Sequence, residues 1–134
     1  MNEFVVFTLG DRKYALALSQ VVEILTPGSV YPIPDSEPYV LGLTNIRGSI
    51  LPVVDIRSFL SEPERQTNTK RHIWVRWGNE DIVIVVDRVE GIKRVSEDDL
   101  KQPPEDITNH KGLEEVFMSE NDLVVVIDPL ALVG

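Results

Sequence analysis

The apolar residues of this chain come in short runs separated by turns, and this pattern restricts the folds open to it. No uninterrupted apolar run exceeds five residues, a length reached at 82–86 and 123–127. Val and Ile, whose branched side chains fit a pleated sheet better than a helix, supply 30 of the 134 residues. Short β-branched runs bounded by turn residues are typical of hairpins. The sequence therefore predicts an all-β fold, mostly strand with a few short helices.

Four pairs of runs have the length and the turn chemistry of antiparallel hairpins. The pairs are 4–9 with 13–18, 41–46 with 49–54, 73–77 with 81–86, and 113–118 with 123–127. Gly10 and Gly78 lie in two of the turns, where glycine tolerates a positive φ. We therefore expect at least eight strands joined largely by tight turns.

Between the hairpins the sequence predicts short helices and one long loop. Ser19 is a candidate N-cap for a helical segment that ends before Pro27, because apolar residues follow it at helical spacing. Those apolar residues are Val21, Ile24 and Leu25. Asp55 and Asp128 each follow an apolar strand and are expected to cap a short helix. Residues 61–70 carry no large apolar side chain and are predicted to form a linker or loop.

The two halves of the chain resemble each other weakly. An offset of 68 residues places Gly10 on Gly78, and an offset of 73 places residues 53–55 on residues 126–128. Turn glycines and capping residues align as well as the apolar positions do, which favours a duplication. Each half could bury one face by curling into a small barrel, and two such barrels would leave a groove where they meet.

Composition and charge reduce the number of possible functions and locations. The chain has no cysteine, which excludes disulfides and thiolate chemistry and fits a reducing compartment. Its formal net charge of −9 disfavours binding to nucleic acid or to anionic lipid. Residues 1–4 show neither a basic nor an apolar leader region, and no run is long enough to span a bilayer. We expect a cytoplasmic protein with no direct membrane insertion.

The reactive side chains of the sequence form no catalytic motif. His72 and His110 lie in polar contexts without a ligand spacing, so solvated side chains are expected. Residues 97–99 (Glu-Asp-Asp) follow Ser96 and are interpreted as a capped turn, because they lack the pattern of a calcium loop. Asp55 and Asp128 lack the following Ser/Thr-Gly of an aspartic protease, so that reading is rejected. We expect no enzyme activity, no metal and no cofactor.

Two tryptophans carry a further expectation about the surface. Trp74 and Trp77 are three residues apart on one predicted strand and should therefore face opposite sides of it. One of the two could lie exposed at an interface, although burial in the strand's own packing is the simpler interpretation.

The stretch 39–57, Tyr-Val-Leu-Gly-Leu-Thr-Asn-Ile-Arg-Gly-Ser-Ile-Leu-Pro-Val-Val-Asp-Ile-Arg, resembles the CheW family. Supporting matches occur at residues 7–10, 14–16, 21–24, 32–34, 85–89 and 126–128. The resemblance implies two intertwined, five-stranded, SH3-like β-barrel subdomains within a single domain of residues 1–134. We place the subdomains approximately at 14–70 and at 71–134 plus the N-terminal strand.

The resemblance also implies a function. CheW proteins are non-enzymatic adaptors that couple the cytoplasmic tips of methyl-accepting chemoreceptors to the regulatory domain of a CheA-type histidine kinase. Carried over to this chain, the receptor groove between the subdomains would include the following partner-binding residues: Val21, Ile24, Leu43, Asn45, Arg47 and Gly48. Structural rather than contact roles are expected for six further residues: Gly10, Gly42, Pro52, Asp55, Gly78 and Asp128.

The residues and the resemblance leave three questions open: the role of Arg47, the pathway, and the use of the cleft. Arg47 can contact a partner through its planar fork of donors, or it can hold the hairpin through an intramolecular bond to an Asp or to the backbone. The family also includes adaptors of twitching or gliding motility, which nothing in this sequence separates from chemotaxis adaptors. A small-molecule sensor using the cleft between the barrels is a further hypothesis.

Overall fold

The computed structural model describes residues 2–103 and 111–134 and contains ten strands in two five-stranded sheets. The first sheet has the order β8-β1-β2-β10-β9 and the second the order β3-β6-β7-β5-β4. The strand bounds are β1 Asn2–Leu9, β2 Arg12–Ala17, β3 Val21–Leu25, β4 Val40–Ile46, β5 Ser49–Val54, β6 Arg71–Trp77, β7 Glu80–Val86, β8 Arg88–Val95, β9 Leu113–Ser119 and β10 Asp122–Ile127. Short helices are η1 Leu18–Gln20, α1 Arg57–Leu60, η2 Glu97–Asp99 and α2 Pro129–Val133. The all-β prediction and the four hairpins are confirmed.

The two sheets are related by the internal repeat, and they exchange strands. The offsets of 68 and 73 residues map β1–β5 onto β6–β10 in order. Each sheet takes its central hairpin (β1–β2 or β6–β7) from one half of the chain and its other three strands from the other half. Both sheets also contain one parallel pair at the equivalent place, β2 with β10 and β5 with β7. The predicted duplication and the intertwined arrangement are thus visible in the strand order.

Sheet membership differs from the expected subdomain ranges, approximately 14–70 and 71–134 plus the N-terminal strand. β2 lies beside β1 in the first sheet, and β6 and β7 lie in the second sheet with β3, β4 and β5. The reason is the exchange of hairpins, because a cut near residue 70 would separate β6 and β7 from the strands that they pair with.

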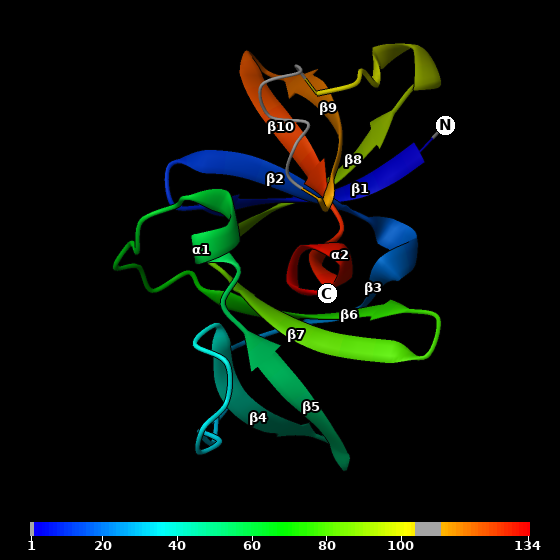
Figure 1. Cartoon of the computed structure of the whole chain (residues 1–134). Coiled ribbons are helices and arrows are strands. Elements are labelled where there is room, and N and C mark those ends of the chain that lie inside the picture. Colours follow the sequence, from blue (N-terminus) through cyan, green and yellow to red (C-terminus); the bar gives the residue numbers. More distant parts are fainter. Residues whose placement is uncertain (1, 104–110) are drawn as a thin grey trace.

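Strand alternation divides the buried side chains among three cores. The largest core lies between the sheets, and α2 sits in this space in Figure 1. It contains Tyr14 and Leu16 of β2, whereas Ala15 between them faces a second core inside the first sheet. A third core fills the curl of the second sheet around Trp74. Side chains on a strand alternate between faces, so strands with cores on both sides must be apolar throughout.

The segment after Ser19 is a strand, so the prediction of a helix there is wrong. Only Leu18–Gln20 forms a single 3-10 turn, and Val21–Leu25 continues as β3. β3 pairs antiparallel with β6, with a bulge between Val21 and Glu23. Three of its five residues are β-branched, and the hydrogen bonds to β6 outweigh the apolar spacing that suggested a helix.

The predicted caps behave differently at the two helices. Asp128 accepts hydrogen bonds from the backbone N–H groups of Leu130 (3.2 Å) and Ala131 (3.4 Å), with Pro129 in the first turn of α2. Asp55 precedes the N-cap of α1 by one residue and accepts from the N–H of Arg57 at 3.0 Å. Both carboxylates therefore satisfy backbone donors at a helix start.

Candidate functional site

The β4–β5 turn is the centre of the candidate partner-binding site. Arg47 (φ 51°) and Gly48 (φ 93°) occupy its two central positions, and positive φ at both is the geometry of a hairpin turn that matches strand twist. The side-chain oxygen of Asn45 accepts a hydrogen bond from the Gly48 N–H at 2.8 Å. These contacts fix the backbone of the turn and leave 65% of the Arg47 side chain exposed.

Arg47 is bound to Glu23, an acidic residue that the sequence reasoning did not single out. The guanidinium donates to both carboxylate oxygens of Glu23, with an Nη1–Oε2 distance of 3.2 Å and a second contact through Nη2. Hydrogen bonding from Arg47 holds the pKa of Glu23 below its ordinary value. Glu23 lies on β3 and the turn joins β4 to β5, so the pair links the two edge strands of the second sheet.

Beside this pair, the chain that connects β3 to β4 is held against β4. Tyr31 and Leu43 exchange two backbone hydrogen bonds, at 2.8 and 2.9 Å. Gly42 (φ 148°) allows this approach, since a Cβ there would lie 2.3 Å from the carbonyl oxygen of Tyr31. Tyr31 itself is 64% exposed. The segment that pairs with β4 therefore presents an exposed aromatic side chain.

The structure brings most, not all, of the expected contact residues together. Ile24, Leu43, Asn45, Arg47 and Gly48 lie on the edge strands of the second sheet or in its β4–β5 turn. The remaining residue, Val21, also lies on β3, but its side chain packs against the core between the sheets.

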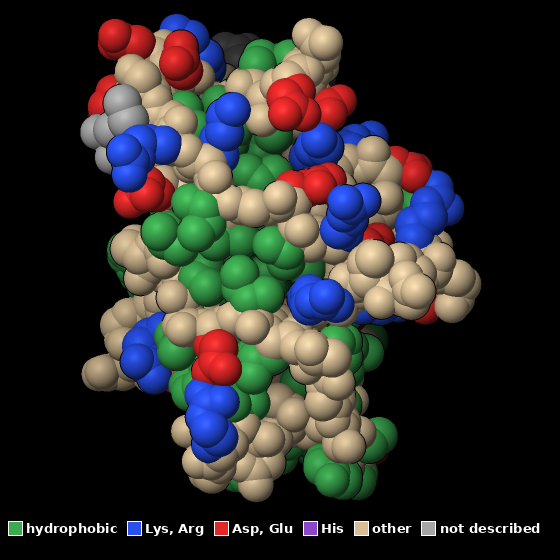
Figure 2. All heavy atoms as spheres, turned by 180° about the vertical axis from the view of Figure 1, so that it is seen from behind, with side chains coloured by type: hydrophobic (Ala, Val, Ile, Leu, Met, Phe, Trp, Pro, Cys, Tyr) green, Lys and Arg blue, Asp and Glu red, His purple; other side chains and the backbone are tan. Residues whose placement is uncertain are grey.

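Exposed apolar side chains accompany this edge. Val22, Ile24 and Leu41 are each about two-fifths exposed, and Ile50, next to the turn, is more so. Figure 2 shows hydrophobic side chains gathered in the middle of the rear face of the molecule, with charged side chains around them. Apolar groups beside a guanidinium fork are suited to recognition of another protein.

A buried carboxylate in the loop of residues 61–70 was also missed from the sequence. The side chain of Glu62 is fully buried. It accepts hydrogen bonds from the Asp11 N–H (2.9 Å), from Arg12 Nη1 (2.9 Å) and from the Tyr14 hydroxyl. Burial and this hydrogen bond raise the pKa of Tyr14. We call the contacts of Glu62 with Asp11, Arg12 and Tyr14 the Glu62 clasp, which ties the loop to the β1–β2 hairpin.

The expected structural glycines and Pro52 lie at turns and strand junctions. Gly10 (φ 62°) donates its N–H to Asp87 at 2.8 Å, and a Cβ there would lie 2.5 Å from Glu62 Oε1. Gly78 (φ 61°) lies at the tip of the β6–β7 hairpin. Pro52 pairs with Leu43 immediately before the parallel pairing of β5 with β7 begins.

Other titratable residues follow the sequence expectations only in part. His72 is buried, with 6% of its surface exposed, so the expectation of a solvated side chain is wrong. It lies on β6, which has strands on both sides, and burial lowers its pKa. His110 lies outside the described residues. The turn at residues 97–99 is capped by Ser96 as expected, and the tryptophans differ as expected, with Trp74 buried and Trp77 61% exposed.

Within 2–103 and 111–134, no three or more His, Cys, Asp or Glu side chains are grouped so that they could hold a metal ion. No helix in that part of the chain has the length and apolar character to cross a bilayer.

These features define a class of protein, a β domain of two five-stranded sheets in which one sheet edge is the candidate binding site. The family model of the CheW-like domain matches residues 3–134. The chain is 28% identical to the chemotaxis protein CheW of Bacillus subtilis, over 98% of this chain and 86% of that protein. It is 29% identical to CheW of Helicobacter pylori, over 93% of this chain and 76% of that protein.

The chain is also similar to a relative with another name and to a solved structure. Protein FrzA of Myxococcus xanthus is 32% identical over 77% of this chain and 65% of its own length. The crystal structure of the scaffolding protein TtCheW from Thermoanaerobacter tengcongensis superposes with a TM-score of 0.86 at 25% identity, covering 95% of this chain and 88% of that one. This chain belongs to the CheW-like domain family, a family of chemotaxis scaffold and adaptor proteins rather than enzymes.

Proposed function

We propose that this chain couples the cytoplasmic tips of methyl-accepting chemoreceptors to the regulatory domain of a CheA-type histidine kinase. It works in the cytoplasm and joins membrane receptor arrays only through these partners. Family membership and the CheW relatives support the scaffold role. The observation that carries the residue assignment is the exposed Arg47–Glu23 pair beside apolar side chains at the edge of the second sheet.

The receptor side of the proposal uses the six residues singled out from the sequence. Ile24 and Leu43 supply apolar contact, and Asn45 and Gly48 shape the turn that presents Arg47. Glu23 orients the guanidinium, which retains an exposed face for a carboxylate or carbonyl of the receptor. Val21 supports β3 from the core side. On the kinase side, we expect one of the two barrels to pair with a CheW-like barrel of the regulatory domain.

Replacing Arg47 with Glu should weaken binding to a receptor cytoplasmic fragment by at least about tenfold, because it places a carboxylate against Glu23 and removes the donor fork. Isothermal titration calorimetry measures this, with thermal melting as the check that the fold persists. Arg94→Glu is a matched control, since Arg94 is equally exposed and pairs with Glu3 on the first sheet. Unchanged receptor affinity in Arg47→Glu would contradict the assignment.

A charge exchange separates recognition from an internal structural role. The double variant Glu23→Arg/Arg47→Glu can re-form the ion pair with its polarity reversed. If Arg47 contacts the receptor, the double variant binds as poorly as Arg47→Glu. Restored affinity would mean that the pair only holds the two edge strands together.

A second candidate is an adaptor of another motility pathway. The similarity to Protein FrzA of Myxococcus xanthus favours it, because that relative is as similar in sequence as the CheW proteins are. The same scaffold surfaces would then meet different receptor and kinase partners, and binding assays with both partner sets distinguish the pathways.

A further inference from the structure

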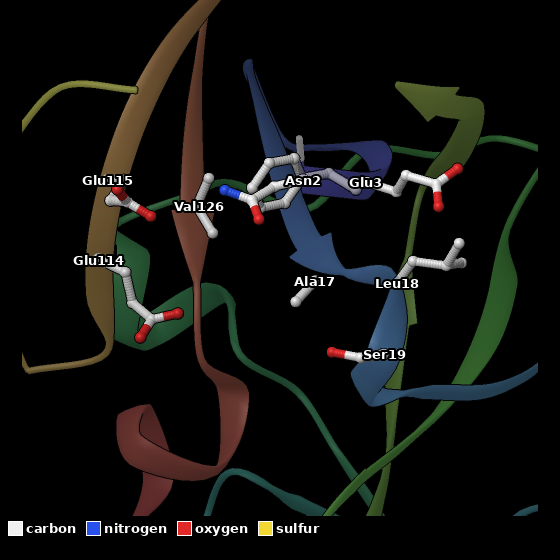
Figure 3. Close-up of a pocket in the computed structure, with 9 residues that line it drawn as sticks. Asn2, Glu3, Ala17, Leu18, Ser19, Glu114, Glu115 and Val126 are labelled. Atoms are coloured by element: carbon white, nitrogen blue, oxygen red, sulfur yellow. The ribbon is translucent and has the colours of Figure 1, made fainter. Parts of the chain in front are cut away.

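A cleft opens in the first sheet at the point where two parallel strands separate. β2 and β10 pair only at three positions, ending with Ala15 opposite Val126. Beyond that point the strands diverge around a hollow of about 520 Å³, which we call the acid cleft. In Figure 3 the side chains of Ala17 and Val126 face the opening, and the carboxylates of Glu114 and Glu115 extend toward it from β9. Glu3 points away from the opening (Figure 3).

The internal repeat provides an equivalent cleft in the second sheet for comparison. This second cleft has a volume of about 170 Å³. Three carboxylates line it, Asp55, Glu64 and Asp87, and Arg57 binds Asp55 with an Nε–Oδ1 distance of 2.9 Å. Lys70 also lines it, with its ammonium 3.9 Å from Glu64. The chain itself therefore supplies cations to the second cleft.

The acid cleft is lined by carboxylates of its own, Glu114 and Glu115 among them, and lacks the cations. Under the repeat offsets, Asp128 is the counterpart of Asp55, whereas Leu130 stands for Arg57 and Asn2 for Lys70. No Lys or Arg is found among the described residues that line the acid cleft. Burial, together with the charges of Asp128 and Glu115, raises the pKa of Glu114, as expected where negative charge is not neutralised.

We propose that the acid cleft binds an arginine- or lysine-bearing segment of a partner protein, with the cation taking the place that Arg57 and Lys70 fill in the second cleft. Carboxylates match the planar donor fork of arginine, and the volume is large enough for a side chain with its flanking backbone. The opening lies on the first sheet, away from the Arg47 turn, so this inference goes beyond the proposed receptor contact.

Nuclear magnetic resonance titration tests this with a defined probe, the capped tripeptide acetyl-Ala-Arg-Ala-amide, against acetyl-Ala-Gln-Ala-amide. We expect saturable amide shifts confined to Ala17, Ser19, Val126 and residues 114–115, with millimolar affinity for the arginine peptide and at least about fivefold weaker binding of the glutamine peptide. Shifts that spread evenly over acidic surface residues, or equal responses to both peptides, would overturn the proposal.

Two variants sharpen the test. The double variant Glu114→Gln/Glu115→Gln removes two charges from the cleft. Asn2→Lys places an ammonium at the position equivalent to Lys70 in the second cleft. Each should weaken binding of the arginine peptide at least about fivefold. Glu37→Gln, on the β3–β4 connection, is the control that changes the net charge without touching the cleft. If neither the double variant nor Asn2→Lys changed the affinity for the arginine peptide, the proposed site would be refuted. Arg47→Glu should leave the titration unchanged, which keeps this outcome separate from the receptor proposal.

Discussion

The variant Gly42→Ala should lose about 3–5 kcal/mol of unfolding free energy, a large part of what a domain of this size has. An added Cβ would lie 2.3 Å from the carbonyl oxygen and 2.6 Å from the carbonyl carbon of Tyr31. Backbone strain adds to this overlap, because φ at Gly42 is 148°. Tyr31 cannot withdraw freely, since it exchanges two hydrogen bonds with Leu43. Chemical denaturation monitored by tryptophan fluorescence measures the loss.

Gly91→Ala is the matched control for the Gly42 variant. Gly91 has nearly the same φ, 142°, and open space where the Cβ would lie. It should therefore show only the cost of backbone strain, about 1–2 kcal/mol. Equal losses in the two variants would mean that contact with Tyr31 does not contribute, and that the segment before β4 is not fixed as described.

Removing the carboxylate of the Glu62 clasp is expected to cause the second large loss. Glu62→Ala leaves the Asp11 N–H, the Tyr14 hydroxyl and one Arg12 donor without their acceptor, and the first two lie at partly or fully buried positions. Unsatisfied buried donors and a lost charged acceptor cost about 2–4 kcal/mol together. Thermal and denaturant unfolding of the variant should show this loss. The pKa of Tyr14 should fall, because Glu62 is one of the groups that raise it.

Glu64→Ala, two residues along the same loop, is the control for the Glu62 variant. Glu64 is more than half exposed and its ion pairs with Arg57 and Lys70 are 3.6 and 3.9 Å long. Exposed pairs of this kind contribute little to stability. If Glu64→Ala were as destabilising as Glu62→Ala, the clasp would not be the main anchor of the loop.

The strands and the repeat could be predicted from the sequence because they depend on local patterns. Alternation of apolar residues and glycine turns marks each hairpin, and aligned turn and capping residues mark the duplication. The exchange of hairpins between the sheets could not be predicted in this way. The exchange depends on strands that pair across the two halves, such as β2 with β10. The apolar pattern would be satisfied equally well if each half paired only with itself.

The errors at β3 and His72 share a physical origin. Val21, Ile24 and Leu25 have helical spacing, but each of them has a pairing partner on β6. His72 follows a polar loop in sequence, yet it lies on the same β6 strand with neighbours on both sides. Pairing with distant strands determines both the conformation of β3 and the burial of His72. A single sequence does not show which strand becomes central in a sheet.

Arg47 could be predicted as a site residue from the sequence, but its partner Glu23 could not. The residue stands out because it lies in a recognisable turn motif next to Gly48. Glu23 is 24 residues away and meets it only because the second sheet curls until its edge strands approach. The acid cleft carries no motif, and only comparison of the two repeats in three dimensions shows its missing cations.

The adaptor role is tested most directly by asking whether this chain bridges two partners. A receptor cytoplasmic fragment and a kinase regulatory domain, each from the same organism, are analysed by sedimentation velocity with and without the chain. We expect the kinase domain to co-sediment with the receptor fragment only when the chain is present, and Arg47→Glu to abolish this bridging. Binding of the two partners in mutual exclusion, or of neither, would contradict the account.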